Sequence, residues 1–391
     1  MKLKRIFVLA LSFLLLFSLI ACNSEEAPSN DTPDAIPEDN AVEETTTEEA
    51  TTAEEPVTDP PQIETKTYKI GTIVDRFKVF GRASVSTLGL ACDHTAAGVE
   101  FRAYVEGKIT ILLNTSGEAY FTLYVDGVRS DKRLKSASGA VTFELGDFET
   151  GGVHTFRLLK QTDIQLATAN LYTISFTGYF LDPPKDNDRY IEFIGDSLTV
   201  GYGNLFPHDG SNPGTAVHQD GTQTFAYLAA QKLGADHSMV AVSGIGLVLG
   251  YRDFPMKDFY AVNSYYRSKT VKFEPTRIPD VVVINLGTND QNKNASIADW
   301  KAGVTALIQQ VRTTYGKDVP IVWAYNMMNP FGAYLQATKD AVNALGGEAA
   351  GIYLCQLTTN KEGGNGHPSL AAHQNSANEL ASFLKEKKIY S

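Results

Sequence analysis

The chain has 391 residues, 43% of them hydrophobic, with 34 basic and 45 acidic side chains and a formal net charge of −11 at pH 7. A chain of this length has room for two folded domains. No basic patch in the sequence supports nucleic-acid binding.

Residues 1–22 have the order of a secretory signal: three basic residues, an apolar run from 6 to 20, and the pair Ala21-Cys22. The apolar run is short for a membrane span. Leu19-Ile20-Ala21-Cys22 resembles the lipobox of bacterial lipoproteins, which implies that Cys22 carries lipid after cleavage and holds the protein at the extracellular face of the cell membrane. A plain signal peptide and an uncleaved anchor are the alternatives, and each of the three exports the protein.

Residues 23–66 differ in composition from the rest of the chain. Thr, Glu, Asp, Pro and Ala dominate, aromatic residues are absent, and no hydrophobic period is visible. Such a segment buries too little apolar surface to offset chain entropy, so we expect a disordered tether. It holds fourteen acidic residues and one lysine, so the acidity of the chain belongs to this linker.

Residues 67–184 are predicted to form an all-β domain. Runs of β-branched and aromatic residues recur there with turn residues between them, at 98–105, 109–113, 120–125, 141–145, 154–159 and 171–176. Glu106-Gly107 and Asp126-Gly127 are expected to be hairpin turns. About eight such strands are typical of a β-sandwich or jelly roll, and Pro183-Pro184 marks its end.

Residues 185–391 show strands that alternate with helices. The expected strands are 190–194, 237–242, 280–286, 319–325 and 351–354, and the expected helices are 224–233, 298–315, 334–345 and 369–387. Thr222 is the expected cap of the first of these helices. The alternation predicts an α/β domain with a parallel sheet and helices on both faces.

Four polar or glycine residues follow these strands or lie in the last loop: Ser197, Gly244, Asn289 and His367. Because the carboxyl ends of parallel strands meet at one edge of a sheet, we expect them in one crevice. A serine hydroxyl becomes nucleophilic when a histidine takes its proton. The backbone N–H groups of Ser197 and Gly244 and the amide of Asn289 are the expected oxyanion donors. For the serine block alone, an ordinary Gly-Asp-Ser turn is the alternative.

The same four segments carry a family resemblance. Gly195-Asp-Ser-Leu-Thr199, Ser243-Gly244, Gly287-Thr-Asn-Asp290 and His367-Pro368 resemble, in order, the four blocks of the SGNH (GDSL) hydrolases. The resemblance implies a flavodoxin-like, three-layer α/β/α domain with Ser197 as nucleophile and His367 as its base.

The preceding domain extends the resemblance to residues 67–391. Val79-Phe-Gly-Arg82, Val125-Asp-Gly127 and the segment 154–160 are similar to carbohydrate esterase family 2, in which a jelly roll precedes the SGNH domain. The resemblance implies removal of acetyl groups from plant polysaccharides such as xylan or glucomannan, through an acetyl-serine intermediate and without a metal or other cofactor.

One position departs from the family pattern. Most SGNH enzymes have an aspartate three residues before the histidine, where this chain has Gly364. A carboxylate there holds the imidazole tautomer. Its replacement is a backbone carbonyl near residue 364, the Asn365 side chain, or Glu362. We favour a Ser–His dyad braced by a carbonyl, with His367 titrating near the ordinary histidine pKa of about 6.5.

Other polar and aromatic residues receive structural or secondary roles. Asp290 is expected to brace the loop that holds Asn289, and Asp196 to make a loop hydrogen bond. His373 is expected to face out of the terminal helix or to pack locally. Trp323, at the end of a strand, is a candidate platform for a sugar ring, with core packing as an equal alternative.

No metal site is expected. The loop 204–223 is polar enough to wall the cleft, and it contains two histidines and two aspartates, but no pair at i, i+4 on a helix. Cys92 and Cys355 fall in separate domains, so a disulfide between them is possible but not expected, and they are too few for a structural zinc site.

These observations predict an exported, lipid-anchored serine esterase that acts on acetylated polysaccharides. A lipid or small-acyl esterase is the rival within the same class, and it would need an apolar cleft near Gly246-Leu-Val-Leu-Gly250. A non-catalytic carbohydrate-binding lipoprotein is the rival from another class. The presence of Ser197, Asn289 and His367 together argues against it.

Overall fold

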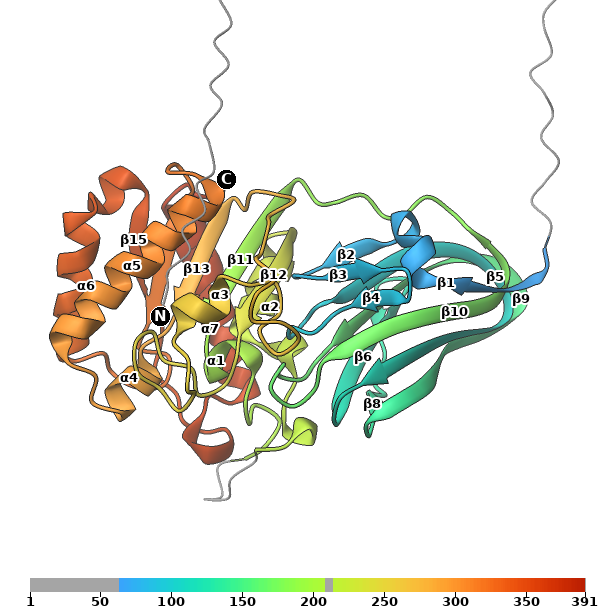
Figure 1. The fold of residues 1–391 in the computed structure, drawn as a ribbon, viewed down its shortest axis with the longest axis horizontal. Coiled ribbons are helices and arrows are strands. Elements are labelled where there is room, and N and C mark those ends of the chain that lie inside the picture. The colour runs from blue at the N-terminus through green and yellow to red at the C-terminus, as the bar shows by residue number, and fades with distance from the viewer. Residues whose placement is uncertain (1–62, 208–213, 391) are drawn as a thin grey trace, which may run out of the picture. The chain divides into compact units, whose positions relative to one another are not determined.

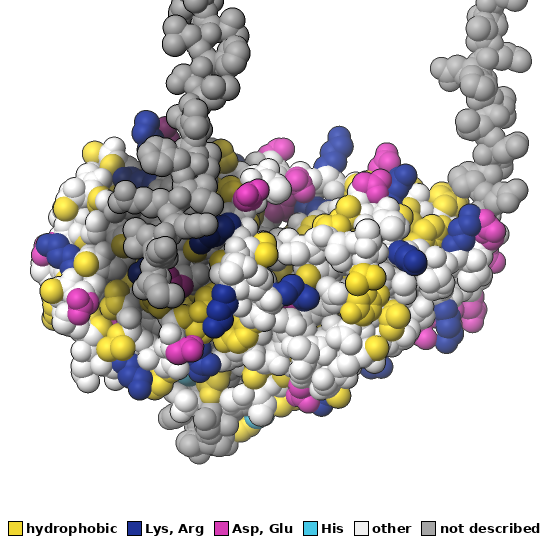
Figure 2. Space-filling model, in the orientation of Figure 1, with side chains coloured by type: hydrophobic (Ala, Val, Ile, Leu, Met, Phe, Trp, Pro, Cys, Tyr) yellow, Lys and Arg dark blue, Asp and Glu magenta, His cyan; other side chains and the backbone are white. Residues whose placement is uncertain are grey.

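The computed structural model describes residues 63–207 and 214–390, which form an antiparallel β-sandwich followed by an α/β domain (Figure 1). The export signal, the lipobox cysteine Cys22 and nearly all of the acidic linker lie outside the described residues. Within the described part of the chain, no helix has the length and hydropathy to cross a membrane. Basic and acidic side chains are interspersed on the face drawn in Figure 2.

The sandwich encloses one apolar core. Along β5 the side chains of Val99, Phe101, Ala103 and Val105 are all fully buried, as the two-residue period of a strand requires. The strands are β1 (Thr65–Lys69), β2 (Lys78–Phe80), β3 (Ser84–Ser86), β4 (Gly89–Ala91), β5 (Gly98–Thr115), β6 (Ala119–Val125), β7 (Val128–Arg129), β8 (Leu134–Ser136), β9 (Gly139–Lys160) and β10 (Ala169–Phe180).

Of the two predicted hairpin turns, one is confirmed and one is wrong. Asp126 and Gly127 connect β6 to β7, and both have positive φ (52° and 79°), as the tight hairpin turn demands. Glu106-Gly107 instead lies inside β5, at a register shift in the pairing with β9. The chain bulges there without reversing, because β9 continues alongside it and supplies the partner for the ladder.

The α/β domain has five parallel strands in the order β12-β11-β13-β14-β15, the flavodoxin-like order that the sequence implied. Helices α2 and α7 pack on one face and α5 and α6 on the other. The elements are β11 (Arg189–Gly195), α1 (Ser197–Val200), α2 (Phe225–Lys232), β12 (Ala235–Ala241), α3 (Met256–Tyr260), β13 (Val281–Asn285), α4 (Thr288–Asn292), α5 (Ile297–Tyr315), β14 (Ile321–Tyr325), α6 (Ala333–Ala344), β15 (Ile352–Gln356) and α7 (Leu370–Glu386). Thr224, not Thr222, caps α2.

Buried ionic contacts join the sandwich to the α/β domain. The Arg82 guanidinium, 3% exposed, donates to the carbonyls of Tyr260 and Val262 and pairs with Glu192 at 3.4 Å. Lys78 pairs with Asp236 at 2.6 Å. Losing one partner of such a buried pair leaves an uncompensated charge, so these contacts fix the two domains against each other.

The two cysteines in the described part of the chain are buried free thiols. Cys92 belongs to the sandwich core, and Cys355 lies on β15 in the core beneath α7. The two described cysteines therefore form no disulfide with each other.

Candidate active site

The turn after β11 presents Ser197 as the first residue of α1 (Figure 1). Gly195 is required just before it, because a Cβ at that position would lie 1.9 Å from the Thr199 hydroxyl. Asp196 caps α1 by accepting the N–H of Leu198. Its role is therefore the local hydrogen bond that the sequence predicted. Burial raises the pKa of this carboxyl to about 7.

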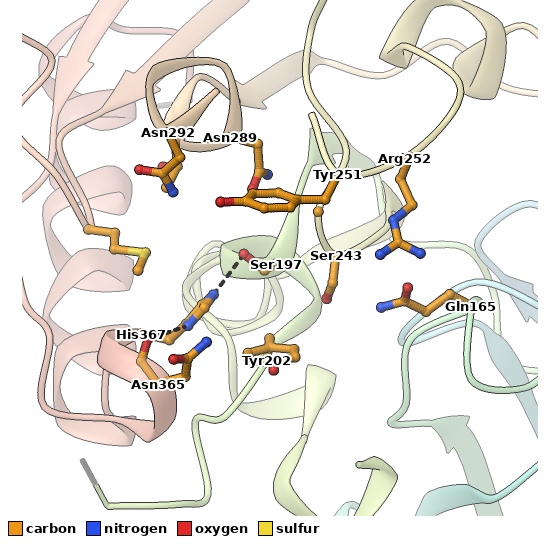
Figure 3. A pocket seen from close by; sticks show the side chains of 13 residues that line it. Gln165, Ser197, Tyr202, Ser243, Tyr251, Arg252, Asn289, Asn292, Asn365 and His367 are labelled. Carbon is orange, nitrogen blue, oxygen red and sulfur yellow. Dashed lines mark hydrogen bonds between the residues drawn. The ribbon is translucent and has the colours of Figure 1, made fainter. Parts of the chain in front are cut away.

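Ser197 and His367 meet across the carboxyl edge of the sheet. The Ser197 Oγ lies 2.9 Å from His367 Nε2, and both residues are less than a tenth exposed (Figure 3). On the other side of the ring, Nδ1 lies 3.3 Å from the backbone carbonyl of Asn365. With the proton on Nδ1 directed at that carbonyl, Nε2 is free to accept the serine proton.

The backbone carbonyl of Asn365 contacts the ring nitrogen of His367 that faces away from Ser197. Asn365 has a φ of 53°, in the left-handed region, and this conformation turns its carbonyl toward the imidazole. Glu362 is exposed and bonds to Asn360 Nδ2 at 2.9 Å. The Asn365 side chain is a hydrogen-bonding neighbour of Tyr202. Three groups were considered as the partner of His367 in place of an aspartate at position 364. Of these, the backbone carbonyl is the one that contacts His367 Nδ1.

Burial lowers the pKa of His367 to about 4, while the carbonyls of Asn365 and Gly364 act in the opposite direction. The expected value near 6.5 was therefore wrong. The sequence could place the histidine in the crevice, but how far the surrounding chain removes it from water is a property of the folded structure.

Two backbone N–H groups beside Ser197 are available to an oxyanion. Neither the N–H of Ser197 nor that of Gly244 has an acceptor within the described part of the chain. Gly244 has a φ of 80°, and a Cβ there would come within 3.2 Å of both Tyr251 and Arg252. Glycine at this position therefore lets Tyr251 and Arg252 pack closely against the turn after β12.

The Asn289 amide lies at the start of α4, after β13, and lines the same pocket. Its Nδ2 donates to the carbonyl of Ile245 at 2.8 Å and makes a longer contact of 3.3 Å to Asp196 Oδ2. One hydrogen is thus held firmly, while the other is in a weak contact that a better acceptor can replace.

Asp290 braces a different loop from the one predicted. Its carboxylate accepts the backbone N–H groups of Leu247, Val248 and Leu249 at 2.8–3.0 Å. These residues follow Gly244, so Asp290 fixes the chain beyond the oxyanion turn.

One cavity of about 520 Å³ is lined by Ser197, Gly244, Asn289 and His367 together with further residues (Figure 3). Several residues of its wall were not predicted, because they come from loops without a recognisable motif. Gln165 is the clearest case, because it belongs to the sandwich. The other lining residues that were not predicted are Tyr202, Tyr251, Arg252, Asn292 and Met328, whereas Ser243, Thr288 and Asn365 lie in segments that the sequence had already indicated.

Trp323 is not a sugar platform. The side chain is fully buried in β14 and packs edge-on against Trp300, with ring centroids 5.7 Å apart. Core packing is therefore its role, because β14 is an inner strand covered by helices on both faces. The exposed aromatic side chain of the pocket is Tyr251, at 54% exposure.

The other predicted candidates lie away from the pocket. His373 is buried and accepts the N–H of Phe225 through Nδ1, so it packs locally and does not face solvent. In the loop 204–223, His208 and Asp209 lie outside the described residues, and Asp220 pairs with Arg129 at 2.6 Å. No described residue of this loop lines the serine cavity. The described residues also contain no group of three potential ligands that could hold a metal ion.

Comparison with known families gives two adjoining matches. Residues 193–378 match the GDSL-like Lipase/Acylhydrolase family, and residues 79–184 match the Carbohydrate esterase 2 N-terminal domain.

Similar proteins extend over both regions. Cellulase/esterase CelE of Acetivibrio thermocellus is 31% identical over 321 residues, 76% of this chain, but the match spans only 38% of CelE. The acetylxylan esterase / glucomannan deacetylase of Cellvibrio japonicus is 29% identical over 61% of this chain and 70% of that protein. A family two carbohydrate esterase from Clostridium thermocellum, solved in complex with cellohexaose, superposes with a TM-score of 0.73 at 27% identity, over 81% of this chain and all of that one. The chain therefore resembles the GDSL-like hydrolases over residues 193–378, and over both matched regions it is similar to family 2 carbohydrate esterases.

Proposed function

We propose that this protein is a serine esterase that removes O-acetyl groups from polysaccharides such as xylan or glucomannan. The observation that carries the proposal is the 2.9 Å contact between Ser197 Oγ and His367 Nε2, beside two unpartnered backbone N–H groups. The names of the similar esterases support the substrate class.

In the first half-reaction Ser197 Oγ attacks the acetyl carbonyl carbon and its proton passes to His367 Nε2. The negative charge that develops on the carbonyl oxygen is stabilised by the N–H groups of Ser197 and Gly244 and by Asn289 Nδ2. As the sugar oxygen leaves, it takes the proton from His367, and an acetyl-serine remains. In the second half-reaction His367 deprotonates a water, which attacks the acetyl carbonyl carbon. As the bond from that carbon to Ser197 Oγ breaks, Oγ takes the proton back from His367 and acetate is released.

The base works as a Ser–His dyad in this proposal. The Asn365 carbonyl holds Nδ1–H and so fixes the tautomer in which Nε2 accepts the proton. A neutral carbonyl stabilises the imidazolium less than a carboxylate would. The low pKa of His367 is consistent with that weaker support.

The alternative of a lipid esterase needs an apolar cleft, and the loop 246–250, which was the candidate for it, gives little support. Leu247 is 3% exposed, and Leu247, Val248 and Leu249 line a separate cavity whose wall does not include Ser197. The serine pocket itself is lined mainly by polar side chains, which suit a short acyl group on a sugar.

The test is acetate release from a panel of acetylated xylan, glucomannan and their oligosaccharides, with 4-nitrophenyl acetate and 4-nitrophenyl butyrate alongside. We expect acetate from at least one glycan and a preference for the acetyl over the butyryl ester. Hydrolysis of the 4-nitrophenyl esters alone would favour the small-acyl esterase, and no hydrolysis at all would favour a binding protein.

We also propose that Cys22 anchors the protein by a lipid on the extracellular face of the membrane, on the support of the lipobox-like segment 19–22. Cells that express the full chain and are fed a labelled fatty acid should label the protein, and Cys22→Ser should remove both the label and the membrane fraction.

A further inference from the structure

A second cavity adjoins the serine pocket. It has a volume of about 450 Å³ and shares Tyr251 and Arg252 with the pocket. This is within the size range of small-molecule sites. Its remaining walls are Asp253, Phe254, Tyr265, Tyr266 and Lys269. A polysaccharide chain that presents its acetyl group to Ser197 therefore has a neighbouring space for its next unit.

The shared wall carries the guanidinium of Arg252. Arg252 forms no ion pair with any carboxylate in the described residues, and its buried Nε has no hydrogen-bond partner there. Tyr266 is its neutral hydrogen-bonding neighbour. Lys269, whose ammonium lies 5.0 Å from the Tyr265 ring centroid, adds a second cation to the cavity against the single carboxylate of Asp253.

An arginine that has no ion pair is suited to binding a carboxylate. A buried donor without an acceptor is costly, and the planar guanidinium matches a carboxylate with two parallel hydrogen bonds. Figure 3 shows the Arg252 guanidinium pointing into the pocket opposite Gln165. A carboxylate bound there would find the neutral Gln165 amide beside it. The lining of the serine pocket contains no Asp or Glu, and the buried Asp163 carboxylate next to Gln165 is already bonded to Gln165 and to the N–H of Ser243.

We propose that the second cavity is a subsite for a carboxylate-bearing sugar, a uronic acid unit next to the acetylated sugar, with Arg252 as the carboxylate ligand. The proposal rests on the proposed function, because it takes Ser197 as the point where the acetyl group reacts. It adds a preference for acidic over neutral acetylated polysaccharides.

The test compares two acetylated xylo-oligosaccharides of equal length, one with a glucuronic acid branch and one without. We expect the wild-type enzyme to have the higher kcat/KM on the acidic substrate, through a lower KM. Arg252→Gln should reduce the acidic-to-neutral ratio by about 10- to 100-fold, the range for a hydrogen bond to a charged group. Lys317→Gln removes the same charge from a side chain that is 86% exposed and should leave the ratio unchanged.

Three outcomes would overturn the proposal. One is a wild-type ratio near unity. Another is an equal loss on both substrates in Arg252→Gln, which would assign Arg252 to the oxyanion beside Gly244. The third comes from 4-nitrophenyl hydrogen succinate compared with 4-nitrophenyl acetate: if the substitution affects only the succinyl ester, the carboxylate belongs to the acyl group.

A binding measurement separates this proposal from the esterase proposal. Calorimetry with Ser197→Ala and unacetylated oligosaccharides, acidic against neutral, needs no turnover. If the wild-type enzyme hydrolyses nothing, including 4-nitrophenyl acetate, the proposed function fails. Tighter binding of the acidic ligand that disappears in the Ser197→Ala/Arg252→Gln double variant would still support the subsite, and equal binding of both ligands would refute it.

Discussion

The carboxylate of Asp163, in the sandwich loop between β9 and β10, accepts a 2.8 Å hydrogen bond from the backbone N–H of Ser243. Asp163 is fully buried, and the same carboxylate accepts the N–H and the side-chain amide of Gln165. The residue that follows Ser243 is Gly244, one of the proposed oxyanion donors. The sandwich domain thus holds the turn on which that donor lies and adds Gln165 to the pocket.

We therefore expect Asp163→Ala to lower kcat on 4-nitrophenyl acetate by about 10²-fold with little change in KM, since a small displacement of a catalytic group has that order of cost. Asp163→Asn keeps an acceptor oxygen for Ser243 and should recover most of the activity. Gln165→Ala is the control, because it removes the side-chain hydrogen bond between Gln165 and Asp163 but leaves the bond between Asp163 and Ser243. Equal activity of the Ala and Asn variants, with both folded by circular dichroism, would show that Asp163 does not position the turn.

Ser197→Ala should abolish ester hydrolysis and leave the thermal unfolding temperature nearly unchanged, because the hydroxyl makes its described side-chain contact with His367 alone. His367→Ala should be comparably severe, since nucleophile and base act as a unit. The measurement is acetate release at saturating substrate. Activity of the serine variant at the wild-type level would refute the nucleophile assignment.

Asn289→Ala should lower kcat by about 10²- to 10³-fold, the usual loss for one oxyanion donor, with a smaller effect on KM. The 2.8 Å bond to the Ile245 carbonyl is lost as well, so the unfolding temperature of the variant has to be measured in parallel. A raised KM at constant kcat would mean that Asn289 binds the ground state.

Removing the side chains near His367 tests the dyad. Glu362→Gln and Asn365→Ala should each retain most of the wild-type kcat, because the imidazole contacts the carbonyl of residue 365 and not these side chains. Loss of a true triad carboxylate can cost about 10⁴-fold. A thousand-fold loss in folded Glu362→Gln would establish a Ser–His–Glu triad instead.

The pH–rate profile should extend further into acid than an ordinary histidine base allows. The base must be neutral, and burial lowers the pKa of His367 to about 4, so kcat/KM should fall only as the pH approaches 4. An acid limb with its midpoint near 6.5 would contradict this assignment.

Unfolding at acid pH is a separate effect. In the unfolded chain His367 takes up a proton near pH 6.5, and so do the buried His237 and His373, whose pKa values burial also lowers. Their contribution to stability is complete above 6.5 and is lost as the pH falls toward 4. Circular dichroism recorded at each pH of the rate profile separates protonation of the base from unfolding.

The placement of much of the proposed catalytic centre was predictable from the sequence. Ser197, Gly244 and Asn289 each follow a strand of one parallel sheet, and short-range patterns locate both the strands and the turns after them. Parallel strands then bring those turns to one edge, whatever the details of packing. The last loop adds His367 at the same edge, 2.9 Å from the serine.

Tertiary packing decided the rest. Trp323 is an aromatic residue of the kind that stacks on sugar rings. It lies on an inner strand that helices cover on both faces, so its side chain is not exposed to solvent. The pKa of His367 depends on burial by residues far away in the sequence, and its tautomer depends on the backbone conformation of Asn365. Asp163 and Arg252 carry no local pattern at all. Their places beside Ser243 and Gly244 come from the docking of the sandwich and the course of a loop, which residues distant in sequence determine together.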